Sequence, residues 1–380
     1  MDERLAEGLP TIDSIETIDV RVPRSGRNRI TTSYATLPDA HHALVRVHAG
    51  GEIGIGEAPA ELWWTGEDAA SVRNAISRYL APALIGAPLD PRAAASAMDA
   101  ALAANPYAKA AVEMALWDLL GRLLGVGLHV LLGGGGLPVP IKYVIGLTDP
   151  AHAREETEWG LAHGFSVLKV KVGGTLAADL TRVTAVVEAA AGKAKVGVDA
   201  NGGWDLPTAL VALEPLAELG VCFLEQPVSA SHPRNMRHLT SRSSVPIVAH
   251  ESVFSVRDAA EAACTGLAHI WALTPSTHGG LVATMDILGI AGGAGIPCLL
   301  GSTVELGVAT AFLTQIGSVF ETIRTCPVPS DVVGPLYHDE DIVRPPVRFE
   351  GGAVHLPAGP GLGVELDDDA ISRFGVDEWR

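Results

Sequence analysis

The sequence contains little cysteine, and its few thiols lie far apart. Cysteine occurs at positions 222, 264, 298 and 326, without a C-x-x-C pair. Structural zinc clusters and disulfide-rich secreted domains depend on closely or regularly spaced cysteines, so this pattern argues against both classes. We expect reduced thiols in a cytoplasmic protein.

Basic residues and long apolar runs are also scarce. The chain has 27 Lys and Arg against 44 Asp and Glu, a formal charge of −17, which argues against nucleic acid or an anionic membrane surface as a partner. A small anionic substrate stays compatible, because a local pair of lysines can outweigh the overall charge at short range. The N-terminus has no signal-peptide pattern, and the apolar stretch 287–300 is too short to span a bilayer.

The chain does contain short apolar runs at a regular spacing. Its 380 residues, 48% of them hydrophobic, are enough for a barrel and a smaller second domain. Helical patterns fill the gaps between the runs, as in the βα repeats of a parallel barrel. The expected strands are 141–147, 166–172, 195–201, 221–227, 246–252, 269–275, 297–303 and roughly 318–325.

These patterns predict the domain organisation. Residues 1–11 form a tail, and 12–135 an α+β unit with an alternating strand at 12–22, a hairpin turning at Gly50-Gly51 and a core helix over 108–125. The GGGG run at 133–136 marks a boundary. Residues 136–328 form the barrel, and 329–380 pack back on the first unit, with a hairpin near 347–356.

Charged side chains stand at the ends of four consecutive runs. Lys171, Asp199, Glu225 and His250 are separated by 28, 26 and 25 residues. Strand ends of a barrel share one rim, where such residues read as catalytic. Two neighbouring carboxylates need a compensating cation, for which a divalent metal is the natural choice, with lysines beside it for proton transfer. The alternative is ordinary strand-end charge in solvated loops.

The motifs resemble those of the enolase superfamily, in its mandelate racemase/muconate lactonizing enzyme family and the muconate-lactonizing-enzyme-like subgroup. The matching segments cover nearly the whole chain; they are AKAAVEMALWDLLGR, LKVKVG, VDANGGW, LEQP, VELGVAT and PGLGVELD. The resemblance implies a (β/α)7β TIM-like barrel with an N-terminal α+β capping domain. It also implies proton removal α to a carboxylate, through an enolate held by a divalent metal, Mg or Mn.

The resemblance assigns roles to individual residues. Lys171 matches the acid/base lysine, and Lys169 beside it either tunes Lys171 by like-charge repulsion or binds the substrate carboxylate. Asp199 and Glu225 match metal ligands, and Asn201 matches a hydrogen-bonding neighbour of the first ligand. Four further positions match residues near the site or on the loop that covers it: Glu305, Glu251, Arg27 and Tyr34.

Two positions depart from the family pattern. His250 stands where the third metal ligand is usually Asp, and imidazole suits Mn²⁺, Fe²⁺, Co²⁺, Ni²⁺ or Zn²⁺ better than Mg²⁺. Either His250 ligates a different metal, or Glu251 replaces the carboxylate, or metal binding is weak or lost. Thr274 stands where a second catalytic lysine is expected, and a threonine needs help to act as a base. His278 is a candidate substitute.

We therefore expect an isomerase or lyase of the muconate cycloisomerase type that acts on a small carboxylate. One alternative is a carboxylate-binding barrel with impaired metal binding and no turnover. Another is a racemase, epimerase or dehydratase. The resemblance further implies a homo-oligomer, possibly an octamer.

Overall fold

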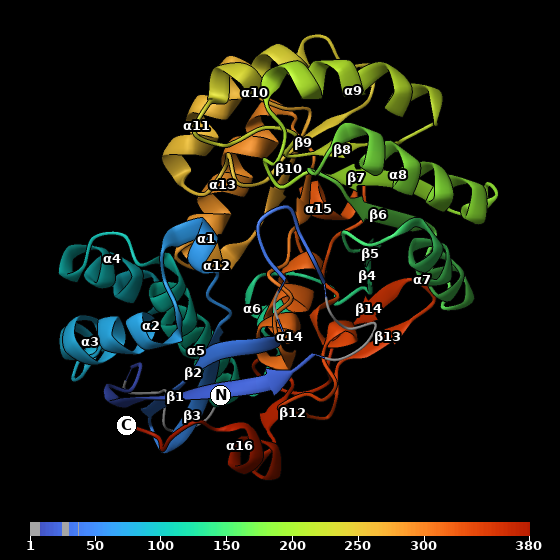
Figure 1. Ribbon diagram of the computed structural model, residues 1–380. Coiled ribbons are helices and arrows are strands. Elements are labelled where there is room, and N and C mark those ends of the chain that lie inside the picture. Colours follow the sequence, from blue (N-terminus) through green and yellow to red (C-terminus); the bar gives the residue numbers. More distant parts are fainter. Residues whose placement is uncertain (1–7, 25–29, 37) are drawn as a thin grey trace.

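The computed structural model describes residues 8–24, 30–36 and 38–380. Within them the chain forms an antiparallel sheet covered by helices, which lies against a curled parallel sheet ringed by helices (Figure 1). The predicted fold class, a TIM-like barrel with an N-terminal capping unit, is confirmed.

The N-terminal unit is a meander followed by helices. Strands β1 (Ile12–Pro23), β2 (Asp39–Ala49) and β3 (Glu52–Ala58) pair antiparallel in that order, and Gly50 and Gly51 turn the predicted hairpin with φ of 59° and 79°. The predicted core helix is α5, whose side chains are mostly buried against β3. The helices are α1 (Leu62–Thr65), α2 (Ala69–Ala75), a π-helical turn (Ile76–Leu80), α3 (Ala81–Leu84), α4 (Pro91–Ala101), α5 (Pro106–Leu124) and α6 (Leu128–Leu131).

The second unit is built on a parallel sheet. Seven strands in the described residues follow the order β11-β10-β9-β8-β7-β6-β5, all parallel. They coincide with the first seven predicted strands, because apolar runs buried on both faces are typical of parallel sheets. The strands are β5 (Tyr143–Ile145), β6 (Val167–Lys171), β7 (Lys195–Asp199), β8 (Leu224–Glu225), β9 (Ile247–Ala249), β10 (Ile270–Leu273) and β11 (Cys298–Leu300).

Helices follow the strands and form an outer ring (Figure 1). They are α7 (Pro150–Ala162), α8 (Leu176–Ala190), α9 (Leu206–Glu218), α10 (Pro233–Thr240), α11 (Val256–Thr265), α12 (Pro275–His278), α13 (Leu281–Ala294) and α14 (Gly307–Gly317). Most of them bury one apolar stripe against the sheet or its neighbours, as amphipathic helices do, whereas α12 and α14 are buried on all sides.

The predicted eighth strand at 318–325 is wrong. That segment carries the short helix α15 (Glu321–Arg324), in which Ile323 is buried while Glu321 and Arg324 are exposed, a helical rather than a strand period. The barrel instead closes through residues 330–331. Ser330 accepts from the Lys142 backbone N–H, and the Asp331 N–H donates to the Leu300 carbonyl, so this segment bridges β5 and β11.

The C-terminal residues return to the N-terminal unit. The predicted hairpin is formed by β13 and β14, and β14 also pairs with β4. The Thr17 N–H donates to the Arg380 carbonyl, and Arg46 lies over the Trp379 ring at 4.1 Å. The domain limits themselves stay a prediction. The elements are β4 (Val139–Pro140), a 3-10 turn (Gly334–Tyr337), β12 (Val343–Arg344), β13 (Arg348–Glu350), β14 (Ala353–His355), β15 (Glu365–Leu366) and α16 (Asp368–Phe374).

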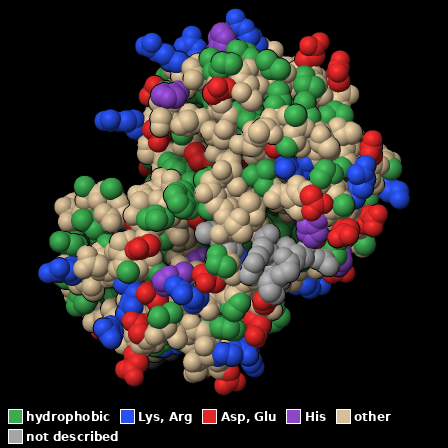
Figure 2. Space-filling model, viewed as in Figure 1, with side chains coloured by type: hydrophobic (Ala, Val, Ile, Leu, Met, Phe, Trp, Pro, Cys, Tyr) green, Lys and Arg blue, Asp and Glu red, His purple; other side chains and the backbone are tan. Residues whose placement is uncertain are grey.

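The surface mixes charges of both signs. On the face in Figure 2, Lys and Arg side chains stand singly or in small groups among acidic ones. Among the described helices, none combines the length and the apolar character needed to cross a bilayer.

Candidate active site

The predicted strand-end residues meet at one rim. In the sheet register Lys171 pairs with Asp199, and Asp199 pairs with Glu225. His250 follows β9 directly, and its ring lies 3.3 Å from Glu225 Oε1 through Nδ1. The structure therefore brings together side chains that are up to about eighty residues apart in sequence, because parallel strands end at the same edge.

Lys169 lies at the centre of a buried carboxylate cluster. Its Nζ donates to Asp331 Oδ2 at 2.8 Å and to both Glu225 carboxylate oxygens at 3.2 Å, and lies 3.3 Å from Asp199 Oδ2. Burial opposes its charge, but Asp331, Glu225 and Asp199 outweigh burial and raise the pKa of Lys169 well above its ordinary value. Lys169 is thus a fixed ammonium, which favours an electrostatic role over a base.

Lys171 is the second buried lysine. Its Nζ donates to Asp199 Oδ2 and to Asn201 Oδ1, both at 2.7 Å. Asn201 in turn donates from Nδ2 to Glu251 Oε1 at 2.9 Å. Burial raises the pKa of Asp199, but Lys171 and Lys169 outweigh it and lower that pKa below its ordinary range. Asn201 therefore links Lys171 to Glu251, and its role in orienting the lysine stays a prediction.

His250 and Thr274 form a pair of their own. His250 Nε2 lies 2.9 Å from Thr274 Oγ1, within a hydrogen bond. A Cβ at Gly301 would lie 2.5 Å from that Nε2, so the absence of a side chain at Gly301 permits the close approach. Burial lowers the pKa of His250, but Glu225 and Glu251 outweigh it and raise that pKa. The Trp64 ring packs edge-on against His250 at 4.9 Å between centroids.

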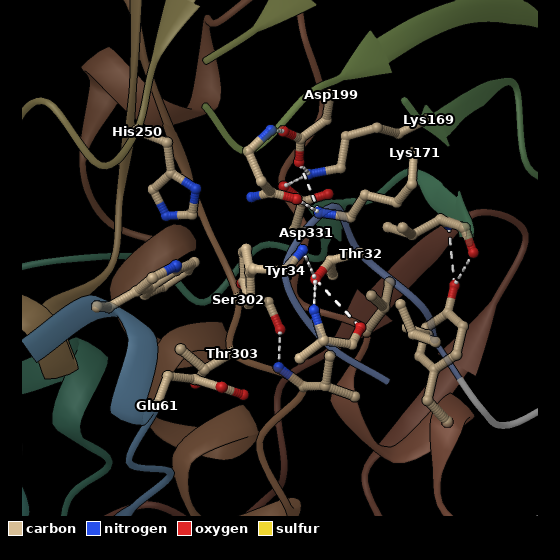
Figure 3. Close-up of a pocket in the computed structure, with 18 of the residues that line it drawn as sticks. Thr32, Tyr34, Glu61, Lys169, Lys171, Asp199, His250, Ser302, Thr303 and Asp331 are labelled. Atoms are coloured by element: carbon tan, nitrogen blue, oxygen red, sulfur yellow. Dashed lines mark hydrogen bonds and ion pairs between the residues drawn. The ribbon is translucent and has the colours of Figure 1, made fainter. Parts of the chain in front are cut away.

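A cavity between the two units is lined by Lys169, Lys171, Asp199, Asn201, His250 and Asp331. In Figure 3, Lys169 and Lys171 reach toward Asp199 and Asp331 on one side, and His250 lies across the cavity. The N-terminal unit closes the opposite wall with side chains that include Arg24, Ile30, Thr32, Tyr34, Glu61 and Trp64.

Glu61 gives the covering wall a titratable group. It follows β3 and lines the cavity, where burial raises its pKa to about 7 against the opposing charges of Arg24 and Lys171. Burial also lowers the pKa of Arg24, whose guanidinium donates to the Val304 carbonyl at 3.1 Å.

Other predicted site residues have different places. Tyr34 lines the cavity, whereas Arg27 lies outside the described residues. Among the described residues, the cavity wall does not include His278 or Glu305. His278 turns away and pairs with the Val253 carbonyl and Thr284, and Glu305 accepts from Ser302 and the Thr303 N–H.

The prediction from sequence missed Asp331, which contacts Lys169 directly. It also missed Arg24, Glu61 and Trp64, because these come from the other unit and reach the cavity only through tertiary packing. One signal for Asp331 was present: it follows Gly301 by 30 residues, close to the barrel spacing. The wrong eighth strand concealed it.

The donor set does not fit the divalent metal that the family implies. In the described part of the chain, no group of three His, Cys, Asp or Glu side chains is arranged to hold a metal. The carboxylates of Asp199, Glu225 and Asp331 converge instead on Lys169 Nζ. His250 already hydrogen-bonds through Nε2, and its Nδ1 faces Glu225. The predicted metal set of Asp199, Glu225 and His250 is therefore not supported by the geometry.

Two family descriptions match this chain over most of its length. Residues 14–133 match "Mandelate racemase / muconate lactonizing enzyme, N-terminal domain", and residues 152–370 match "Enolase C-terminal domain-like". The chain belongs to the mandelate racemase/muconate lactonizing enzyme family. Family members share the enolase-superfamily fold described above, so the predicted resemblance is confirmed.

Individual relatives of this family member are cycloisomerases and epimerases. Muconate cycloisomerase 1 of Rhodococcus opacus is 34% identical over 372 residues, 96% of this chain and 98% of that protein. The muconate lactonizing enzyme of Pseudomonas fluorescens complexed with muconolactone superposes with a TM-score of 0.91 at 31% identity, covering 97% and 100% of the chains. A dipeptide epimerase of Cytophaga hutchinsonii complexed with Mg and the dipeptide D-Ala-L-Val superposes with a TM-score of 0.91 at 27% identity. The match covers 97% of this chain and 99% of that chain.

Proposed function

We propose that this family member is an isomerase or lyase of the cycloisomerase type, which transfers a proton at the carbon α to the carboxylate of a small organic acid. The observation that carries the proposal is the hydrogen-bond geometry of Lys171. An ammonium has three N–H donors, and two of them are directed at Asp199 and Asn201. Among the described residues, the third is left for a ligand in the cavity that Lys171 lines.

Lys171 Nζ is placed to exchange a proton with a ligand in the cavity. In a cycloisomerisation, a carboxylate oxygen of an unsaturated diacid adds to the C=C bond of the same molecule. The electron pair of that bond moves to the carbon α to the second carboxylate as an enolate, and Lys171 Nζ then gives this carbon its proton. The reverse reaction breaks the α C–H bond, returns the proton to Lys171 and expels the ring oxygen, so that atoms and electrons balance in both directions.

Thr274 supports chemistry on a single face. Racemisation needs proton-transfer groups on both faces of the α-carbon, and Thr274 occupies the place where a second lysine would stand. Its hydroxyl is engaged with His250, and the candidate substitute His278 is directed elsewhere. A cycloisomerase or lyase needs the Lys171 side alone.

The test is turnover of muconate, chloromuconates and muconolactone by the intact protein in D2O. We expect product that carries one deuterium at the α-carbon with a single stereochemistry. Lys171→Ala should lower kcat at least about 100-fold, because general acid catalysis supplies about 10² to 10⁴ in rate. Lys195→Ala, at the exposed start of β7, is the matched control and should retain activity. Full turnover by Lys171→Ala on any substrate found would refute the proposal.

A carboxylate-binding barrel without turnover is the second candidate, and the misfit of the metal set favours it. One result distinguishes this binding protein from the cycloisomerase proposed above. A ligand that binds in the cavity, seen by NMR line broadening, would show no solvent deuterium at its α-carbon even after long incubation. Exchange into both enantiomers of a chiral acid would instead point to a racemase or epimerase.

A further inference from the structure

The carboxylate cluster at the barrel mouth already holds a cation of its own. Three buried carboxylates face Lys169 Nζ: Asp331 at 2.8 Å, Glu225 at 3.2 Å and Asp199 at 3.3 Å. The three N–H donors of an ammonium are enough for these three acceptors. Lys169 thus fills the point on which the carboxylates converge.

The carboxylates that face Lys169 also have other ammonium partners. Asp331 is also within 3.1 Å of Lys142 Nζ, and Asp199 is bonded to Lys171. Three carboxylates therefore face three ammonium groups: Lys142, Lys169 and Lys171. A divalent cation among them would be repelled by Lys169 at close range, where water screens poorly.

The histidine corner of the cluster has one engaged ring nitrogen. Nε2 of His250 is hydrogen-bonded to Thr274 Oγ1, whereas Nδ1 is buried without a hydrogen bond and lies 3.3 Å from Glu225 Oε1. Gly301 leaves the ring the space for this bond, because a Cβ there would lie 2.5 Å from Nε2. Trp64 packs on its other side.

We infer that the Lys169 ammonium takes the place of the divalent metal in this chain, so that its barrel-mouth site is independent of metal. Lys169 holds the three carboxylates together and supplies the fixed positive charge beside which an anionic substrate is bound. The role of Lys169 in binding an anionic substrate rests on the proposed function. The absence of a metal requirement can be tested without a substrate.

Mn²⁺ titration of the full-length protein, followed by electron paramagnetic resonance and calorimetry, tests the inference. Wild type should show no stoichiometric Mn²⁺ site and no rise in melting temperature with Mn²⁺. Lys169→Met combined with His250→Asp removes the ammonium and adds a carboxylate, and should bind one Mn²⁺ at least about tenfold more tightly than wild type, the scale on which a site's supporting groups change metal affinity. Lys193→Met, at an exposed position, is the control and should behave as wild type.

Each outcome decides the matter. Binding of one Mn²⁺ per wild-type chain, measured by electron paramagnetic resonance and calorimetry, would overturn the inference. If the double variant does not fold in buffer, recovery of its melting transition on adding Mn²⁺ supports the inference, and failure to recover counts against it. His250→Asp alone should bind no more Mn²⁺ than wild type, because Lys169 remains. Absence of turnover in a metal-free wild type would affect only the proposed function.

Discussion

At the scale of single residues, the site is held by groups that carry no chemistry. Gln226 lies in the motif LEQP after β8 and is fully buried. Its Oε1 accepts from the backbone N–H groups of His250 and Ser252, and its Nε2 donates to the Val228 carbonyl and Ser252 Oγ. The amide therefore fixes the loop that carries His250, a role invisible in the spacing of charges.

Gln226→Met should destabilise the fold strongly while keeping the side-chain volume. The change leaves the His250 N–H buried without its acceptor, and one unsatisfied buried polar group costs about 1–3 kcal/mol. We expect a loss of about 2–4 kcal/mol in the free energy of unfolding, because two N–H groups are affected. Urea unfolding monitored by circular dichroism measures it. A variant as stable as wild type would show that the loop holds His250 without this amide.

At the scale of elements, the sequence predicted the strands that show a local hydrophobic period. It did not predict the segment that closes the barrel through only a few backbone hydrogen bonds. Strands β6 to β9 are apolar runs with charges at their ends. The sequence therefore predicted that they are neighbours and that their charged ends lie at the same edge of the sheet. Residues 330–331 close the barrel with a few backbone hydrogen bonds and have no apolar run to reveal them. Arg24, Glu61 and Trp64 could not be assigned to the site, because their position follows from docking of the two units.

Glu57 shows how strand β3 and helix α14 are joined. Its carboxylate accepts from the Leu306 and Ala309 N–H groups at the start of α14, at 2.7 and 2.9 Å. His42 Nδ1 lies 2.8 Å from the same carboxylate, and burial keeps the pKa of His42 well below its ordinary value. Burial raises the pKa of Glu57 from 4.5 to about 7, although the backbone donors oppose the rise.

Glu57 should make stability fall as pH rises from about 5 to 8. The folded-state pKa lies above the unfolded value, so the folded chain retains a proton that the unfolded chain has released, and the stabilisation is lost as pH passes through about 7. Up to about 3 kcal/mol is involved, since one pKa unit corresponds to about 1.4 kcal/mol.

Glu57→Gln is the comparison that isolates this effect. It should flatten the dependence of the melting temperature on pH over that range. The neighbouring acids Glu305 and Asp341 remain in both proteins, and because burial and the Glu57 charge both raise the pKa of each, the difference between the two proteins also contains their coupling to Glu57. Parallel curves for the two proteins would contradict the assignment to Glu57.

At the scale of the whole molecule, the site exists because two units are docked. One wall of the cavity comes from the N-terminal unit and the other from the barrel. Buried carboxylates of the first unit accept backbone N–H groups of the second: Glu57 at α14, and Glu113 Oε1 at Val282 in α13, at 2.9 Å. The predicted assembly into a homo-oligomer stays a prediction, separate from this docking within one chain.

Gly280 is a point where this docking leaves no room for a side chain. Its φ is 130°, and a Cβ there would lie 2.2 Å from Glu113 Oε2, on a carboxylate held in place by Val282 and Trp117. Gly280→Ala should therefore destabilise the protein by about 1–3 kcal/mol through backbone strain and the displaced carboxylate.

Gly289, in the helix α13 that Gly280 precedes, is the matched control. Among the described atoms, none lies within 4 Å of a Cβ built there, so Gly289→Ala should stabilise the fold by about 0.5–1 kcal/mol through helix propensity. Thermal unfolding of the three proteins measures both changes. Since each unit completes the cavity of the other, Gly280→Ala should also weaken ligand binding while Gly289→Ala leaves it unchanged. If both alanines shifted stability in the same direction, the contact between Glu113 and Gly280 would not be what joins the two units.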